Sequence, residues 1–178
     1  MPAAPIHLVP IYLPNHTTVL AQLAPRLEQA FATSVVVRAS RFDPEGAFDG
    51  SRGQYHATAL LDLLLGEERD ARVLGVAGVD LFIPILTYVF GEAQLEGTAA
   101  VVSTYRLDNA IYGLPKDDRL LLDRLTKEAV HELGHTFGLL HCRRSQCVMH
   151  SSTYAEDIDL KSARFCTSCD PMAGPGRK

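Results

Sequence analysis

The stretch His131–His141, with the sequence HELGHTFGLLH, determines how the rest of the chain is interpreted. His131 and His135 are four residues apart, so on a helix both imidazoles face the same side and can bind one metal ion. Gly138 is the residue type that commonly ends a helix in the left-handed conformation. A turn there brings His141 back towards the same ion. Three nitrogen ligands leave a fourth position open for water, as in catalytic zinc sites.

Glu132, next to His131, indicates the chemistry of this site. Its carboxylate can face the open side of the metal without binding it. Zinc lowers the pKa of a bound water molecule to roughly 7. Glu132 can therefore accept a proton as a general base and later pass it to a leaving amine. Imidazole ligands also suit iron and nickel, so zinc is an inference at this point.

A second metal site is indicated by the cysteines, which all lie in the last quarter of the chain as two close pairs: Cys142, Cys147, Cys166 and Cys169. This spacing is typical of a structural four-cysteine zinc site. Two disulfides or a redox pair are the alternatives, although a redox motif normally opens a helix after an early strand. Four thiolates on one zinc ion carry an excess negative charge, which nearby basic residues could offset: Arg143, Arg144, Lys161 and Arg164.

Composition limits the class of protein. The chain has 178 residues, of which 47% are hydrophobic, and a formal net charge of −4. It is long enough for one domain with a core, and too acidic to favour nucleic-acid binding. The most apolar window, residues 73–90, contains Asp80 and Pro84 and is interpreted as a strand and a turn, not a membrane span. No targeting signal or pro-segment is recognised. We expect a soluble, cytoplasmic protein without a membrane partner.

Apolar periodicity predicts an α/β (α+β) fold, because the first hundred residues alternate strands and helices and so favour a mixed, mostly parallel sheet. The predicted strands are 7–11, 35–38, 73–79, 90–94 and 99–105. The predicted helices are 17–31, with Thr17 or Thr18 as its N-cap, 55–65 and 117–140. Residues 43–53 are predicted to form a loop and residues 173–178 a frayed tail.

The motif residues resemble those of a known family. His131–His141 with Met149 is similar to the signature and Met-turn of metzincin zinc peptidases. The interleaved cysteines, with Lys161 and Phe165, resemble those of the archaemetzincins. The resemblance implies a compact metzincin-like fold forming a single catalytic domain over residues 1–178.

Within that domain, the resemblance implies two subdomains. The upper one, 1–138, holds a mixed twisted sheet, a backing helix and the active-site helix. The lower one, 139–178, holds the third zinc ligand, the Met-turn, the four-cysteine site and a C-terminal helix. Met149 is expected beneath the catalytic zinc as a hydrophobic floor and not as a ligand.

The implied activity is that of a zinc-dependent metallopeptidase with two zinc ions per chain, one catalytic and one structural, acting on peptides or unfolded polypeptides. Extended substrate is expected to pair with an antiparallel edge strand, for which residues 90–95 are the first candidate and 101–105 the second. We expect a monomer.

Two other functions share these residues: hydrolysis of a different amide, and peptide binding by a zinc-stabilised protein with little or no turnover. Glu132 argues against the second, because binding alone needs no general base. Tyr105, Tyr112 and Tyr154 are candidates for stabilising an oxyanion, although packing or surface roles are the simpler interpretation. The sequence assigns no substrate-binding residues.

The adjacency of His141 and Cys142 generates a first prediction. If consecutive residues bind different metal ions, the structural zinc fixes the third catalytic ligand. Cys166→Ser or Cys169→Ser should then lower the affinity of the histidine site for zinc as well as the stability of the fold. Chelator competition on the purified variants measures this, and unchanged activity with unchanged catalytic metal affinity would contradict it.

Overall fold

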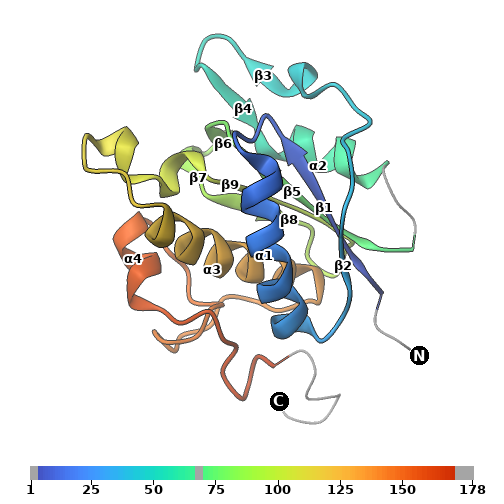
Figure 1. The fold of residues 1–178 in the computed structure, drawn as a ribbon, viewed down its shortest axis with the longest axis vertical. Coiled ribbons are helices and arrows are strands. Elements are labelled where there is room, and N and C mark those ends of the chain that lie inside the picture. The colour runs from blue at the N-terminus through green and yellow to red at the C-terminus, as the bar shows by residue number, and fades with distance from the viewer. Residues whose placement is uncertain (1–3, 67–69, 171–178) are drawn as a thin grey trace.

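The fold is built around a five-stranded mixed sheet, seen in a computed structural model that describes residues 4–66 and 70–170 (Figure 1). In spatial order the strands are β2 (Val35–Val37), β1 (Ile6–Ile11), β5 (Arg72–Ala77), β9 (Ala99–Ser103) and β8 (Gly91–Ala93). The first four are parallel, and β8 is antiparallel to β9. β8 thus forms one edge of the sheet.

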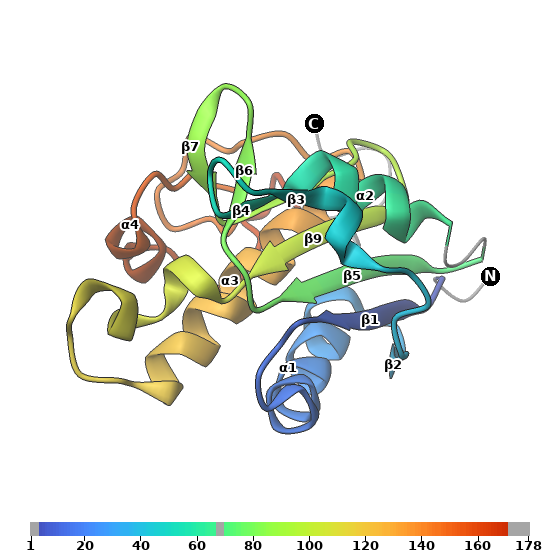
Figure 2. The same cartoon turned by 90° about the horizontal axis from the view of Figure 1, so that it is seen from above.

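Helices cover both faces of this sheet (Figure 2). The long helices α1 (His16–Phe31) and α3 (Asp118–Thr136) pack on one face, and α2 (Ala57–Leu65) packs on the other. Side chains of a strand alternate between faces, so Leu8 joins the core under α1 and α3 while Val9 joins the core under α2. The α/β class with a mixed twisted sheet is therefore confirmed.

A second, smaller sheet has four strands. Its order is β3 (Phe48–Asp49), β4 (Gln54–His56), β6 (Leu81–Ile83) and β7 (Leu86–Val89). The loop predicted for 43–53 is wrong in part, because it contains the 3₁₀ helix η1 (Pro44–Ala47) and β3. The single strand and turn predicted for 73–90 prove to be three strands. Such short strands depend on distant partners, for example β4 on β6, and have no local periodicity.

Three predicted helix ends were also wrong. α2 begins at Ala57 and not at residue 55, because Tyr55 and His56 belong to β4. α1 begins at His16 after Asn15, which adopts φ 52° and makes no side-chain cap, so neither Thr17 nor Thr18 is the N-cap. α3 ends at Thr136, four residues before the predicted end. The reason is Gly138, whose φ of +85° lies in the left-handed region and turns the chain away from the helix axis.

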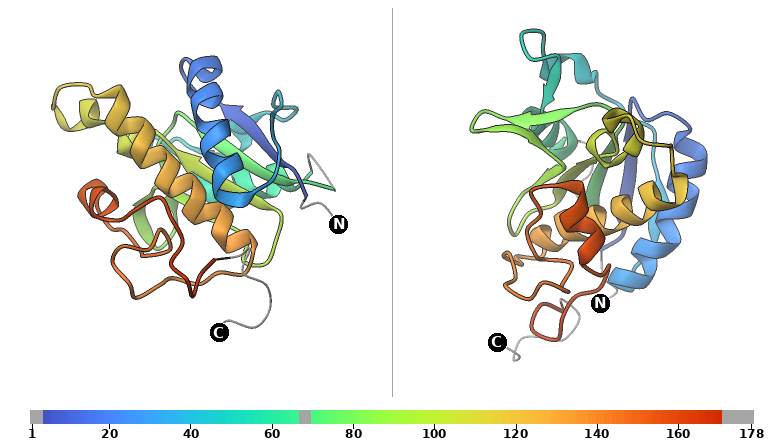
Figure 3. Two further views of the ribbon diagram at one scale, coloured as in Figure 1. Left: turned by 60° about the horizontal axis from the view of Figure 1, so that its bottom comes forward. Right: turned by 90° about the vertical axis from the view of Figure 1, so that its left-hand side faces the viewer.

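Beyond Gly138 the chain lies along the side of α3 with little regular structure (Figure 3). Its one helix among the described residues is α4 (Ala155–Leu160), which an ion pair between Arg124 and Asp159 ties to α3 at 2.7 Å. Two 3₁₀ helices, η2 (Tyr105–Leu107) and η3 (Asn109–Tyr112), connect β9 to α3. The predicted tail, 173–178, lies outside the described residues. Across the described ranges, no helix is long and apolar enough to cross a membrane.

The left-handed turn generates a stability prediction. Gly138→Ala should lower the free energy of unfolding by about 1–2 kcal/mol, because an L residue with a Cβ is strained in that conformation. Gly46→Ala is the matched control, since a Cβ there meets nothing within 4 Å and its φ is not positive. Urea denaturation of both variants tests this, and equal stability of the two variants would contradict it.

Candidate metal centre

The three histidines of the motif converge on one point. α3 carries His131 and His135, whose Nε2 atoms are 3.2 Å apart, and the loop after Gly138 brings His141 beside them. One nitrogen from each lies within 4.8 Å of the other two. A tetrahedral zinc ion with bonds of 2.0–2.1 Å separates its nitrogen ligands by about 3.4 Å. The donor set therefore fits a zinc ion.

Backbone carbonyl groups fix the orientation of the imidazoles. His131 Nδ1 donates to the carbonyl oxygen of Val148 at 2.8 Å, and His135 Nδ1 donates to that of Leu139 at 2.7 Å. With Nδ1 protonated, Nε2 keeps its lone pair for the shared point. Burial lowers the pKa of all three histidines, that of His131 to about 3. The neutral form, which is the form that binds metal, is thus favoured.

Glu132 lies beside the triad in a cleft of about 430 Å³. Residues 86–91 form one wall of the cleft and residues 151–154 the other. Burial raises the pKa of the Glu132 carboxyl well above its ordinary value, and the neighbouring Glu128 raises it further while Lys161 opposes the rise. A dication at the triad would also oppose it. The carboxyl group lines the cleft together with His131 and His141.

A close backbone approach positions Glu132. Gly91 of β8 crosses α3 at this residue, and a Cβ at Gly91 would lie 2.7 Å from Glu132 Cγ and 2.5 Å from the carbonyl oxygen of Val101. Only glycine fits between the strand and the carboxylate. The edge strand and the acidic side chain are therefore in direct contact.

Met149 is fully buried and packs against α3. A Cβ on Gly134, which stands between His131 and His135 on α3, would lie 2.5 Å from Met149 Sδ and 3.3 Å from Phe165. The methionine carbonyl also accepts the N–H of Cys142 at 2.9 Å. The side chain thus packs against the helix at the level of the two histidines.

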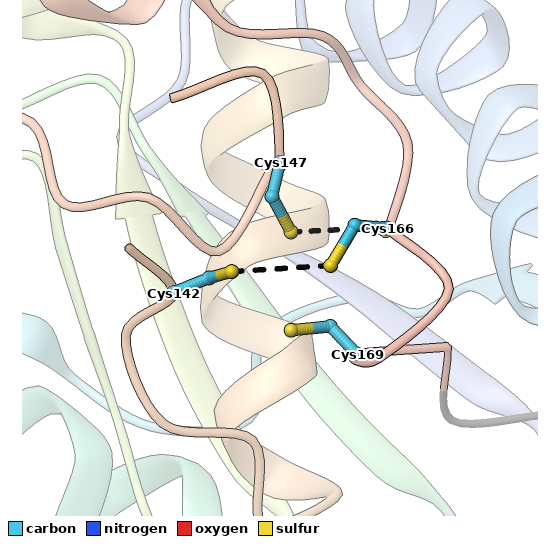
Figure 4. A group of neighbouring side chains, drawn as sticks. All are labelled: Cys142, Cys147, Cys166 and Cys169. Carbon is cyan, nitrogen blue, oxygen red and sulfur yellow. Dashed lines mark hydrogen bonds between the residues drawn. The ribbon is translucent and has the colours of Figure 1, made fainter. Parts of the chain in front are cut away.

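The four cysteines form a second cluster (Figure 4). Cys142 and Cys147 belong to the segment after α3 and face Cys166 and Cys169 of the C-terminal loop. Their Sγ atoms all lie within 4.8 Å of one another, and Cys142 Sγ is 3.9 Å from Cys166 Sγ. Zinc–sulfur bonds of 2.3 Å place tetrahedral thiolates about 3.8 Å apart. The geometry fits zinc, and all four cysteines are free of disulfides.

Lys161 does not offset the charge of these thiolates as the sequence suggested. Its Nζ lies 2.8 Å from Glu128 Oε1 and donates to the carbonyl oxygen of His150 at 3.0 Å. Backbone N–H groups contact the sulfurs instead, from Arg144 to Cys142 Sγ at 3.5 Å and from Cys166 to Cys147 Sγ at 3.4 Å. The ammonium group of Lys161 is therefore paired with a buried carboxylate on α3, and not with the cysteines that lie near it in sequence.

Of the candidate tyrosines, Tyr154 alone lines the cleft, whereas Tyr112 donates its hydroxyl to the carbonyl oxygen of Arg106. Sequence reasoning missed Tyr88, which lines the cleft and whose hydroxyl donates to the carbonyl oxygen of Thr153 on the opposite wall at 3.0 Å. It also missed Glu128. Tyr88 lies on a short strand and pairs with a residue 65 positions away, so no local spacing reveals it.

Comparisons with known proteins show the family to which the chain belongs. The sequence model of the family named peptidase family M54 matches residues 28–172 of this chain. An archaemetzincin from Haloquadratum walsbyi is 39% identical over 149 residues, which are 82% of this chain and 86% of that protein.

Solved structures match the fold over nearly the whole chain. The archaemetzincin crystal structure from Methanopyrus kandleri has a TM-score of 0.82 at 38% identity and covers 93% of this chain and 91% of its own. A zinc-dependent peptidase from Methanocorpusculum labreanum has a TM-score of 0.82 at 29% identity, covering 92% of this chain and 97% of its own.

The fold and the family place this protein among the zinc metallopeptidases. The fold is the metzincin-like one that the sequence resemblance implied. Within that class, the chain belongs to peptidase family M54 and is archaemetzincin-like.

The contact between Gly134 and Met149 predicts the sign of the change in stability when Gly134 is replaced by alanine. Replacing a helical glycine by alanine normally raises the free energy of unfolding by about 1 kcal/mol. Here Gly134→Ala should lower the free energy of unfolding by about 1 kcal/mol. The reason is that the added methyl group overpacks the buried side chains, and this destabilises the fold more than the higher helix propensity of alanine stabilises it. In a Met149→Ala background the same substitution should be stabilising. Urea denaturation of the four proteins tests the pair, and a stabilising effect in the wild-type background would show that the contact is absent.

Proposed function

We propose that this archaemetzincin-like metallopeptidase hydrolyses peptide bonds with His131, His135 and His141 holding a catalytic zinc ion and Glu132 acting as general base. The observation that carries the proposal is the convergence of three imidazole donors, two of which line the same cleft as the buried carboxylate of Glu132. When bound there, zinc would acidify water and polarise the scissile carbonyl.

The protein's own groups supply the proton transfers. Glu132 accepts a proton from the attacking water and afterwards delivers it to the leaving amine. Its burial favours this role, because a raised pKa brings the proton affinity of a carboxylate closer to that of the groups it serves. Because Gly91 has no side chain, strand β8 can approach the carboxylate closely: a Cβ there would lie 2.7 Å from Glu132 Cγ.

The edge strand β8 is the proposed site of substrate pairing. Its residues pair with β9 through Gly91–Val102, Glu92–Val101 and Ala93–Ala100, and within the described part of the chain its other edge has no strand partner. An extended peptide can add there as a further strand, bound mainly through its backbone. The substrates are therefore peptides or unfolded polypeptides, with limited dependence on sequence.

The cysteine cluster is the proposed structural zinc site, which gives two zinc ions per chain. Four thiolates complete a tetrahedron and leave no position for water, so this ion stabilises without reacting. Residues 1–178 then form a single catalytic domain in which 1–138 supplies the sheet and active-site helix and 139–178 supplies the third ligand, Met149 as a hydrophobic floor, and the cysteine site.

Substitution of Glu132 separates an enzyme from a peptide-binding protein. Glu132→Gln and Glu132→Ala should lower kcat/KM for fluorogenic peptides by about 10²–10⁴-fold, because general-base catalysis is lost. Zinc content and peptide affinity should stay unchanged. The control is Glu45→Gln, which removes a carboxylate that interacts with Tyr12 and Tyr55. Turnover of the alanine variant equal to that of wild type would contradict the assignment of the base.

A further inference from the structure

Lys161 is a buried cation close to the histidine triad whose role the proposed mechanism leaves open. It follows α4 directly, and its side chain is 1% exposed. Its ammonium group contacts Glu128 Oε1 at 2.8 Å and the carbonyl oxygen of His150 at 3.0 Å. A buried lysine is costly unless it is paired, so two such specific contacts fix its position closely.

The first contact ties Lys161 to the helix of the catalytic ligands. Glu128 lies on α3 one turn before Glu132 and three residues before His131, and its side chain is 5% exposed. Both partners of this ion pair are buried, so neither side chain can move far. The pair therefore fixes the position of Lys161 relative to His131 and His135.

The second contact ties Lys161 to the loop of the third ligand. The carbonyl oxygen that it contacts belongs to His150, whose Nδ1 donates to the carbonyl oxygen of Cys142 at 2.9 Å. The N–H of Cys142 in turn donates to the carbonyl oxygen of Met149. Cys142 directly follows His141. Two hydrogen-bonded links therefore join the ammonium group to the backbone next to the third ligand.

We propose that Lys161 is a positioning residue that fixes His141 relative to His131 and His135. The inference rests on the proposed role of these histidines as ligands. Lys161 does not act on substrate; it connects the two parts of the protein, helix and loop, that must hold one ion between them. Groups that orient metal ligands in this way commonly change metal affinity by about 10–100-fold when removed.

A second ion pair in the molecule is a matched control. Arg124 on α3 binds Asp159 on α4 through two contacts of 2.8 and 2.7 Å, and the arginine side chain is 6% exposed. This pair also joins the two helices and stabilises the fold. The other hydrogen bonds of Arg124 among the described residues go to Leu107 and Asn109, and none reaches the loop of His141.

The test is the zinc affinity of the histidine site in four variants, measured by chelator competition. They are Lys161→Met, Lys161→Arg, the double variant Lys161→Met/Glu128→Gln, which leaves no unpaired buried charge, and Asp159→Asn. Cobalt(II) spectra monitor the cysteine site separately through its thiolate charge-transfer bands.

Lys161→Met and the double variant should lose about 10–100-fold in zinc affinity at the histidines. Their cobalt–thiolate spectra should be unchanged, and Lys161→Arg should recover part of the loss. Asp159→Asn should lower the urea midpoint without changing that affinity.

Wild-type affinity in the double variant, or an equal loss in Asp159→Asn, would overturn the positioning role while leaving the proposed function intact. Absence of zinc from the histidines of the wild-type protein would overturn both. The wild-type measurement thus distinguishes failure of the inference from failure of the function.

Discussion

The peptide bond between His141 and Cys142 joins the histidine cluster directly to the cysteine cluster. One residue faces the histidine cluster and the next faces the cysteine cluster, and the ligand atoms within each cluster lie within 4.8 Å of one another. The segment beyond Gly138 has a single short helix among its described residues, so regular secondary structure holds little of its backbone. A structural metal can supply the cross-links that such a segment lacks. In this account the position of the third catalytic ligand follows from the cysteine site.

The sheet and its helices provide the rigid side of this junction. α3 is anchored in the core by residues such as Ala129, Val130 and Leu133, all fully buried, so the two helical histidines cannot shift independently. Strand β8 lies against the same helix at Gly91 and brings the free edge of the sheet to the carboxylate of Glu132. The proposed substrate-pairing edge, the proposed general base and the two helical histidines therefore share one rigid framework. His141 and the opposite wall of the cleft come from the segment that follows α3.

Sequence alone predicted the parts of this arrangement that depend on spacing along the chain. Ligands four residues apart on a helix, a glycine turn and two cysteine pairs have fixed local geometry, and the structure brings those residues together. The main strands and helices were also predicted, because each carries its own apolar period. The Lys161–Glu128 pair, the Tyr88–Thr153 contact and the β6–β7 hairpin were not. These join residues that have no repeating separation, and only the assembled fold brings them together. The misplaced end of α3 shows the same limit, since apolar residues continue past Gly138.

The most direct test of the two-site account is the zinc content of freshly purified, untagged protein, compared with that of His135→Ala. The account predicts about two zinc ions per chain in the wild type and about one in the variant, with the remaining ion bound by four sulfurs in X-ray absorption spectra. Wild-type protein that holds no zinc and has oxidised cysteines would contradict the account. So would a variant that keeps the full zinc content.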